Sequence, residues 1–343
     1  MNSVESFGII GYGEFGQVAA RHLAPHDAHV RIFDTDDRKE LPMNAERASL
    51  SSVASSDVVV MAVPFEAYDE VIPELLDSSE PDTLVVDVCS VKMRPEQKFA
   101  DSGLLDRPNV LMTHPLFGPQ TTNETIVGKT IVTTDARGPR TQELLNDWNI
   151  KGIKQVEMTA QDHDREMAKV HVLPFIIGRS LLEMGVTDSP LTTNYFGKLL
   201  ALIDVERHHS PELFNTIQQH NPYALNMRAE LIATMCVLHA QVIVDGHNPN
   251  SDVKEMLNAH RSTIDIIDEY RMVLLGLRFA ITDQVGELKA QDELPSIDLE
   301  REEAQRLAID AQAKQANVKV ALAQAIQRLV VDEVVTQHNQ KKQ

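Results

Sequence analysis

The chain has 343 residues, of which 43% are hydrophobic and 24% charged, so it is long and apolar enough for two or three folded domains. Its formal net charge of -19 disfavours nucleic acids and anionic membranes as partners, because an acidic protein repels their phosphates. No apolar run approaches the roughly 18 residues of a membrane span, and the first residues lack a signal-peptide pattern, so we expect a cytoplasmic protein.

The cysteine content excludes a disulfide framework and a four-cysteine zinc site. The chain has two cysteines, Cys89 and Cys236, and each lies inside an apolar segment. We expect both to be reduced residues of a hydrophobic core, and no metal site is predicted.

The first 135 residues alternate short β-branched runs with helical patterns. The expected strands lie at residues 7–11, 29–34, 57–64, 83–90, 109–115 and 129–134. This alternation predicts an α/β fold of the Rossmann type, a doubly wound parallel sheet, which we assign to residues 1–158.

A glycine-rich motif joins the first expected strand to a helix. In the G-x-G-x-x-G pattern, Gly11 permits a tight turn, Gly13 lets the backbone approach a pyrophosphate, and Gly16 lets helix and strand pack closely. Phe15 lies inside the same turn, and Asp34 ends the second strand, where a carboxylate accepts hydrogen bonds from the ribose hydroxyls and repels a 2′-phosphate. The motif in this context predicts an NAD site.

Ligands of such sheets bind outside the carboxyl ends of the strands, which directs attention to two segments. His114 stands at the end of one strand, before a proline, and is placed to take the proton of a substrate hydroxyl as hydride leaves the same carbon. Ser90 ends the neighbouring strand and is expected to bind that hydroxyl or to orient the imidazole. The alternative for both is an ordinary polar loop residue.

Beyond residue 159 the pattern changes to long helices, at 162–184, 199–205 and 211–246, with a break near residues 221–222. A run of turn-forming residues at 245–252 ends this segment. We therefore expect a second, all-α domain at residues 159–250.

Four segments in this order, GYGEFG, DVCSVK, HPLFGP and QDHDRE, resemble the prephenate and arogenate dehydrogenases of tyrosine biosynthesis. The resemblance covers about residues 5–245 and implies an oxidative decarboxylation, with NAD as hydride acceptor, His114 as proton acceptor and the all-α domain in dimerisation. It also points to His171 and Lys198 as substrate-binding residues, although this chain has Phe175 where many members have histidine. The alternative for His171 and Lys198 is a solvated helix face.

The last ninety residues contain apolar positions at spacings of three, four and seven, which predict amphipathic helices. Arg278 and Lys289 are eleven residues apart, which places them within about 20° of one face and about 16 Å apart along a helix. Arg261 is about 25 Å from Arg278 along a straight helix and cannot reach the same small ligand from that helix.

The segments LNAHRSTIDIID, LRFAI, VGELK and DLERE in this region are similar to the all-helical chorismate mutases, in which two chains intertwine. The resemblance implies a mutase domain at residues 253–343, with Arg261 crossing to the partner's site. It assigns to the site the side chains of Arg261, Arg278, Lys289, Asp298, Arg301, Glu302 and Gln337, with Glu333 where many members have serine.

The sequence thus predicts a homodimeric, bifunctional enzyme that rearranges chorismate to prephenate and oxidises prephenate to 4-hydroxyphenylpyruvate with NAD. Rearrangement of chorismate needs a held conformer and stabilised charge on the ether oxygen, for which cations and hydrogen-bond donors suffice. Two alternatives stay open: an arogenate dehydrogenase fused to a mutase, and a dehydrogenase whose C-terminal helices only dimerise.

Overall fold

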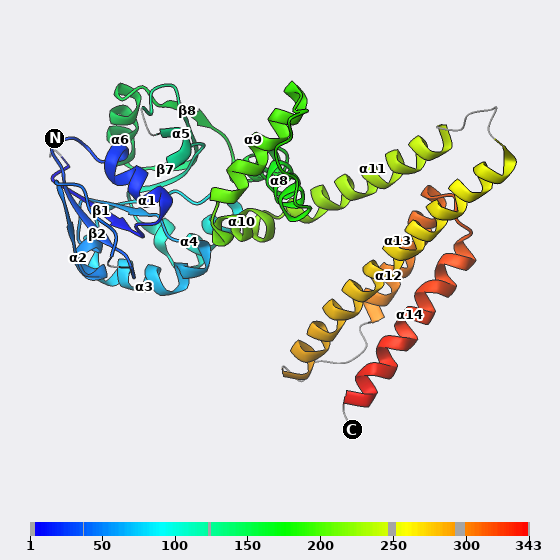
Figure 1. Ribbon diagram of the computed structural model, residues 1–343. Coiled ribbons are helices and arrows are strands. Elements are labelled where there is room, and N and C mark those ends of the chain that lie inside the picture. Colours follow the sequence, from blue (N-terminus) through cyan, green and yellow to red (C-terminus); the bar gives the residue numbers. More distant parts are fainter. Residues whose placement is uncertain (1–3, 37, 123–124, 246–251, 292–298, 342–343) are drawn as a thin grey trace. The chain divides into compact units, whose positions relative to one another are not determined.

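The computed structural model describes residues 4–36, 38–122, 125–245, 252–291 and 299–341. The chain forms two compact units, Met1–Val237 and Leu238–Gln343 (Figure 1). The first contains a sheet and helices, and the second is helical in its described part.

A single sheet organises the first unit, with strand order β3-β2-β1-β4-β5-β6-β7-β8. Its strands are β1 (Ser6–Ile10), β2 (His29–Phe33), β3 (Ala45–Arg47), β4 (Val58–Met61), β5 (Leu84–Asp87), β6 (Val110–Pro115), β7 (Thr130–Arg137) and β8 (Lys154–Glu157). Neighbouring strands are parallel, except that β7 runs antiparallel to β6. The six expected strands are confirmed, whereas β3, β8 and the reversed direction of β7 were not predicted.

Helices cover both faces of the sheet, as a doubly wound fold requires (Figure 1). They are α1 (Glu14–Val18), η1 (Ala19–Leu23), α2 (Leu50–Ala54), η2 (Phe65–Ala67), α3 (Tyr68–Ser78), α4 (Met93–Asp101), η3 (Leu104–Asp106), α5 (Pro119–Thr122) and α6 (Pro139–Ile150). One core joins the sheet to α1, η1 and α6, and the other joins it to α2, α3 and α4. The side chains of strand β4 alternate between the two cores, because successive residues of a strand point to opposite faces of the sheet. Val58 and Val60 lie in the first core, while Val59 and Met61 lie in the second.

The remainder of the first unit is helical. Its elements are α7 (Ala160–Met167), η4 (Ala168–Val172), α8 (Leu173–Glu183), α9 (Asn194–His208), α10 (Pro211–Asn215), η5 (Thr216–His220) and α11 (Ala224–Asp245). A small core of its own contains Ala168, Val172, Phe175, Ile217 and Ala224. The expected helices are present, including the break near residues 221–222.

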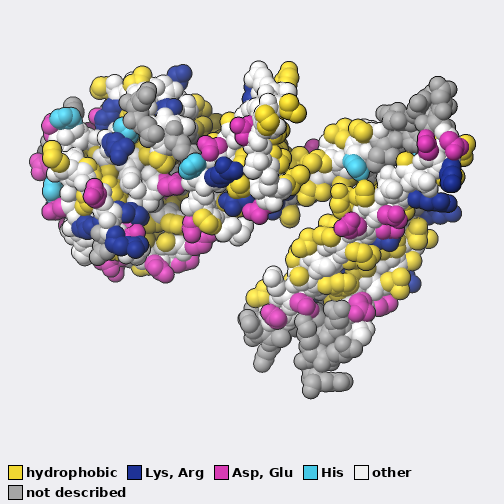
Figure 2. All heavy atoms as spheres, in the orientation of Figure 1, with side chains coloured by type: hydrophobic (Ala, Val, Ile, Leu, Met, Phe, Trp, Pro, Cys, Tyr) yellow, Lys and Arg dark blue, Asp and Glu magenta, His cyan; other side chains and the backbone are white. Residues whose placement is uncertain are grey.

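The second unit consists, in its described part, of the end of α11 and of α12 (Val253–Gln291), α13 (Leu299–Gln315) and α14 (Val320–Lys341). Helix α14 packs against both α13 and α12. Hydrophobic side chains are exposed along these helices (Figure 2). None of the helices in the described ranges is both long and apolar enough to cross a membrane.

The two cysteines differ from the expectation in one respect. Cys89 is a buried core residue, as predicted, and burial raises the pKa of its thiol to about 12. Cys236 is a free thiol but is exposed on α11, so its assignment to a core was wrong. The apolar residues around it, such as Met235 and Val237, are themselves exposed in the single chain.

Candidate active site

The glycine motif forms a tight turn between β1 and α1. Gly11 has a φ of +93°, and a Cβ at this position would lie 2.5 Å from the carbonyl oxygen of Ala62. A Cβ at Gly16 would lie 2.0 Å from the carbonyl oxygen of Gly11. Gly13 differs, since none of the described atoms lies within 4 Å of a Cβ built there. Only glycine fits the two close approaches, and Gly13 leaves open space where a phosphate group could approach the backbone.

Asp34 follows β2 and lies beside this turn. Its carboxylate accepts hydrogen bonds from the backbone N–H groups of Tyr12 and Asp36. The Nζ atom of Lys39 lies 3.5 Å from the same carboxylate. Both Asp34 and Lys39 line the cavity described next, as does the side chain of Phe15.

A cavity of about 910 Å³ connects the glycine turn with the ends of β5 and β6. Ser90 and His114 line it, and residues of α8, α9 and α10 close its far side. Phe15 and Phe117 lie with ring centroids 6.2 Å apart at its wall. The expected cofactor residues Gly13, Phe15 and Asp34 therefore lie along the same cavity as the two expected hydride-transfer residues.

A chain of hydrogen bonds holds the imidazole of His114. Its Nδ1 lies 2.8 Å from Nε2 of His163, whose Nδ1 in turn lies 2.8 Å from Oδ1 of Asp164. All three side chains are buried. An ionised carboxylate only accepts, so His163 carries its hydrogen on Nδ1 and accepts from His114 through Nε2. His114 therefore keeps a free lone pair on Nε2, as a proton acceptor requires.

Asp164 is fixed by the surrounding backbone. Its carboxylate also accepts the N–H groups of Lys92 and Met93, at 2.8 and 2.9 Å, where α4 begins. Asn221 donates to its carbonyl oxygen. The SVK segment and α7 are thus joined at one buried carboxylate, which compensates the free N–H groups of α4.

Burial lowers the pKa of three histidines near the strand ends, His114, His163 and His171. Burial, aided by the nearby His163, His171 and Lys92, holds the pKa of His114 well below its usual value. The pKa of His163 is also lowered by burial, against the opposing effect of Asp164, and that of His171 falls to about 4. His114 is therefore neutral near pH 7 and able to accept a proton.

Lys92 links the ends of strands β5 and β6 next to the site. It is fully buried, and its Nζ donates to the carboxylate of Asp87 and to the carbonyl oxygen of Thr113, the residue before His114. The hydroxyl of Tyr68 donates to the same carboxylate of Asp87. A buried cation paired in this way fixes β5 and β6 at the point where the site residues begin.

The two substrate residues expected from the resemblance differ in position. His171 lines the cavity, with its ring centroid 5.1 Å from that of His114, so it does not lie on a solvated helix face. Lys198 is exposed on α9, with Nζ 5.8 Å from the ring of Tyr195, and is not among the described residues that line the cavity. Ser90 lines the cavity, but His163 is the residue that orients His114.

The expected mutase residues lie in the second unit. Arg261, Arg278 and Lys289 share the single helix α12. Arg278 is partly buried, and its Nη1 atom is buried without a hydrogen-bond partner among the described residues. Arg301 and Glu302 begin α13, whereas Asp298 and the side chain of Gln337 lie outside the described part.

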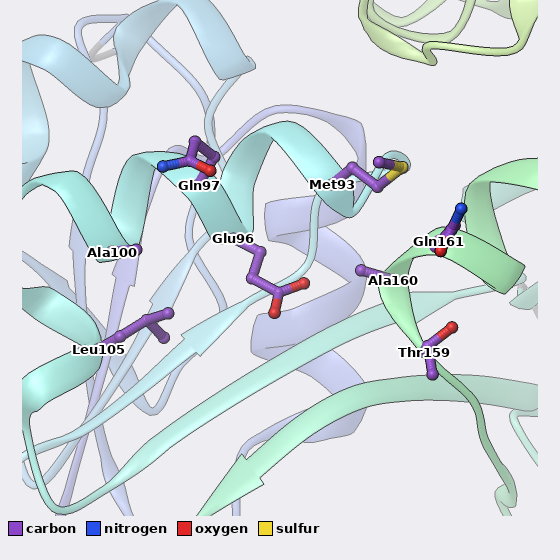
Figure 3. A pocket seen from close by; sticks show the side chains of 8 residues that line it. All are labelled: Met93, Glu96, Gln97, Ala100, Leu105, Thr159, Ala160 and Gln161. Carbon is purple, nitrogen blue, oxygen red and sulfur yellow. The ribbon is translucent and has the colours of Figure 1, made fainter.

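A second cavity, of about 400 Å³, lies between α4 and α7. Glu96 extends from α4 into this space, whereas Gln97 lies on another side of the helix (Figure 3). Burial raises the pKa of Glu96. The described part of the chain contains no group of three or more His, Cys, Asp or Glu side chains placed to hold a metal ion.

Comparison with protein families assigns the two ends of the chain. Residues 29–147 match the nucleotide-binding domain of prephenate dehydrogenase, and residues 260–339 match chorismate mutase type II. The chain thus contains a nucleotide-binding domain of the prephenate dehydrogenase type and a chorismate mutase domain. It is therefore an enzyme with two catalytic domains. Residues 180–253 also match a model described as TYRAAT1-like, C-terminal domain.

Similar proteins of known name include an arogenate dehydrogenase and a T-protein. Arogenate dehydrogenase 2 of Arabidopsis thaliana is 26% identical over 67% of this chain and 68% of its own length. The T-protein of Haemophilus influenzae is 29% identical over 48% of this chain and 40% of its own length. These alignments reach at most about two thirds of each relative.

Solved structures share the fold at low identity. A prephenate dehydrogenase from Aquifex aeolicus, in complex with hydroxyphenyl propionate and NAD+, has a TM-score of 0.54 and 16% identity. It covers 80% of this chain and 99% of its own. The arogenate dehydrogenase of Synechocystis has a TM-score of 0.50 and 18% identity, over 77% of this chain and 99% of its own.

Proposed function

We propose that the chain converts chorismate to prephenate in its C-terminal unit and oxidises prephenate to 4-hydroxyphenylpyruvate and carbon dioxide in its N-terminal unit. The observation that supports the oxidation best is the single cavity that runs from the glycine turn and Asp34 to the buried His114. A nucleotide site and an oriented proton acceptor at the two parts of one cavity are what a hydride-transfer enzyme needs.

His114 accepts the proton of the substrate hydroxyl through Nε2. The hydrogen bond to His163 orients the ring and keeps this nitrogen unprotonated. Hydride leaves the carbon that carries the hydroxyl, and the loss of carbon dioxide from the opposite ring carbon makes the ring aromatic. Ser90 is proposed to bind the same hydroxyl from the end of β5.

NAD is the cofactor, and it supplies the hydride acceptor when bound. The residues present fit it, because Gly13 leaves open space beside the turn and Asp34 lines the cavity. We propose that Gly11, Gly13, Phe15 and Gly16 surround the pyrophosphate. We assign the ribose hydroxyls to Asp34, whose charge disfavours the 2′-phosphate of NADP.

The mutase site is proposed to use Arg261, Arg278, Lys289, Asp298, Arg301, Glu302 and Gln337. The family match spans all of these positions. Positive charge on Arg278 and Lys289 along α12 suits a substrate with two carboxylates and an ether oxygen that gains negative charge. This match disfavours the alternative in which the C-terminal helices only dimerise.

We propose that the chain is a homodimer. Large apolar side chains are exposed along α12 at spacings of three, four and seven, as at the interface of paired helices (Figure 2). They include Leu257, Ile264, Ile267, Leu274, Ile281, Val285 and Leu288. A second copy of α12 would bury them and bring Arg261 to the partner's mutase site. We also propose a cytoplasmic location, since the two free thiols suit a reducing compartment.

Arogenate is the second candidate substrate of the dehydrogenase, because the similar plant protein is an arogenate dehydrogenase. The mutase domain favours prephenate, since prephenate is the mutase product and an arogenate enzyme would need a transamination between the two steps. Separate assays with prephenate and with arogenate decide between them.

The test of the whole proposal is product analysis from chorismate with and without NAD. We expect prephenate alone without NAD, and 4-hydroxyphenylpyruvate, carbon dioxide and NADH with it. Chorismate that stays unchanged in both reactions would refute the mutase assignment. Prephenate that accumulates in the presence of NAD would refute the prephenate dehydrogenase assignment.

A further inference from the structure

The far end of the large cavity offers little fixed positive charge for an anionic substrate. Among the described residues that line it, Lys39 is the only lysine or arginine, and it lies at the nucleotide end beside Asp34. The substrate of the proposed dehydrogenase carries carboxylates opposite its hydroxyl. A side chain other than lysine or arginine must therefore bind these carboxylates near α8, α9 and α10.

His209 is the side chain placed to meet these carboxylates. It follows the last residue of α9 and lines the cavity, and its Nδ1 lies 3.3 Å from Oε1 of Glu206. The side chain of Glu206 is fully buried. Glu206 occupies Nδ1 as a hydrogen-bond acceptor, so Nε2 is left for a ligand, and a carboxylate ligand there would be met by the second N–H of an imidazolium.

The packing of α8 against α9 holds this pair in place. A Cβ at Gly178 would lie 2.6 Å from Cγ of Glu206, so glycine permits the close approach of the two helices. Phe175 stacks on His209, with centroids 4.5 Å apart and planes at 13°. Arg179 lies 3.6 Å from the other oxygen of Glu206. The positive charge of Arg179 offsets the negative charge of Glu206, so the pair does not repel an anion that binds at His209.

His171 lies between the reacting end and this cluster. Its ring is 5.1 Å from that of His114 and 5.6 Å from that of Phe175, by centroids. Its Nδ1 is buried and has no hydrogen-bond partner among the described residues. A buried, unpaired nitrogen on the cavity wall indicates a missing polar ligand.

We propose that His209, held by Glu206, binds a carboxylate of the dehydrogenase substrate, with His171 as a neutral hydrogen-bonding neighbour. This subsite rests on the proposed function and gives it a specificity residue that the glycine motif and the strand ends do not supply. His209 touches the substrate, and Glu206 is a positioning residue that acts through His209.

The first experiment is steady-state kinetics of the full-length His209→Asn variant. We expect KM for prephenate to rise about 10- to 100-fold, as for loss of a charged hydrogen bond, with kcat changed less than about threefold. His208→Asn is the matched control, because His208 is the preceding residue, is exposed and bonds to the carbonyl oxygen of Asp204. It should retain the wild-type KM. The affinity for NAD and the thermal midpoint verify that each variant is folded.

Glu206→Gln tests the positioning role, because glutamine keeps the shape and removes the charge. KM for prephenate should rise in the same direction while kcat changes little, a split that general damage to the fold would not produce. A fall in kcat with unchanged KM would contradict the role given to Glu206.

Inhibitor binding distinguishes the two substrate carboxylates. We would compare 3-(4-hydroxyphenyl)propionate with its uncharged primary amide, measured by calorimetry on the NAD complex. If the His209→Asn variant binds the acid more weakly than the wild type does but binds the amide equally well, His209 is assigned to the side-chain carboxylate. Unchanged acid binding with a raised KM for prephenate assigns it to the ring carboxylate.

The subsite is refuted if folded His209→Asn keeps the wild-type KM for prephenate and binds the acid as the wild type does. Failure of the proposed function gives a different result, because the wild-type enzyme itself would then not oxidise prephenate. In that case the comparison of acid with amide still tests the subsite by binding alone.

Discussion

The Nδ1 atom of His114 lies 2.8 Å from Nε2 of His163, and this contact decides which nitrogen of His114 can accept a proton. We expect His163→Asn to lower dehydrogenase kcat by about 10- to 100-fold, the range for residues that orient a functional imidazole. The affinity for NAD and the mutase activity should stay near the wild type. Equal losses in NAD binding and kcat would indicate a structural defect instead.

Removal of the proton acceptor itself should have a larger effect. His114→Asn should lower dehydrogenase kcat by about 100-fold or more, the usual scale for the loss of a general base. Mutase activity, which depends on the other unit, should remain near the wild type. Assays of both reactions on one preparation measure this, and a comparable loss of both would mean that the substitution damages folding.

Asp34→Ser tests the preference for NAD over NADP. The substitution removes the charge that repels a 2′-phosphate. It also removes the carboxylate that lies 3.5 Å from Nζ of Lys39 in the wild type, so Lys39 becomes available to bind the 2′-phosphate. The ratio of kcat/KM for NAD to that for NADP should fall. Asp34→Asn is the control that keeps an acceptor for the N–H groups of Tyr12 and Asp36. An unchanged ratio in both variants would show that Asp34 does not read the ribose.

The buried histidines also predict how stability depends on pH. His114, His163 and His171 have pKa values below the usual 6.5 in the folded chain. As pH falls below that value, these three side chains therefore bind protons in the unfolded chain before they do so in the folded chain. The free energy of unfolding should then decrease toward lower pH, by up to about 1.4 kcal/mol per pH unit for each histidine. Urea unfolding of the dehydrogenase unit between about pH 7.5 and about pH 5 measures this slope. His171→Asn should make it shallower, and an identical slope would contradict burial as the cause.

The sequence was sufficient to predict the central strands of the sheet, because these strands are buried on both faces. Continuous apolar runs such as that of β4 are visible without any partner. The short edge strands β3 and β8 are largely polar and exposed, so their residues carry no such pattern. The reversed direction of β7 depends on its pairing with β6, which periodicity does not encode.

The site was predicted at its strand ends and, through the resemblance, at His171, but not at His163 or His209. His163 is one of 13 histidines and sits in a polar segment, although it shares the buried face of α7 with Ala160, Asp164 and Met167. That spacing of three, four and seven was the available signal. His209 had none, because its role depends on the packing of α9 against Phe175 of α8.

The last prediction concerns Arg261, which should serve the mutase site of the partner chain. Arg261 and Arg278 are 17 residues apart on the continuous helix α12, which separates them by about 25 Å along the axis. Two arginine side chains cannot bridge that distance around one small ligand, so a shared site requires two chains. Arg261→Ala should abolish mutase activity, because a substrate carboxylate without its cation costs several kcal/mol of binding.

Complementation tests the crossed arrangement directly. Arg261→Ala and Arg278→Ala chains, each inactive alone, are co-expressed with different tags, and the mixed dimer is purified and assayed for loss of chorismate. One of its two sites then has both arginines, so about half of the wild-type mutase activity should return. Dehydrogenase activity, unaffected in all three preparations, verifies that the chains are folded. A mixed, folded dimer no more active than either parent would mean that the mutase site, if present, lies within one chain.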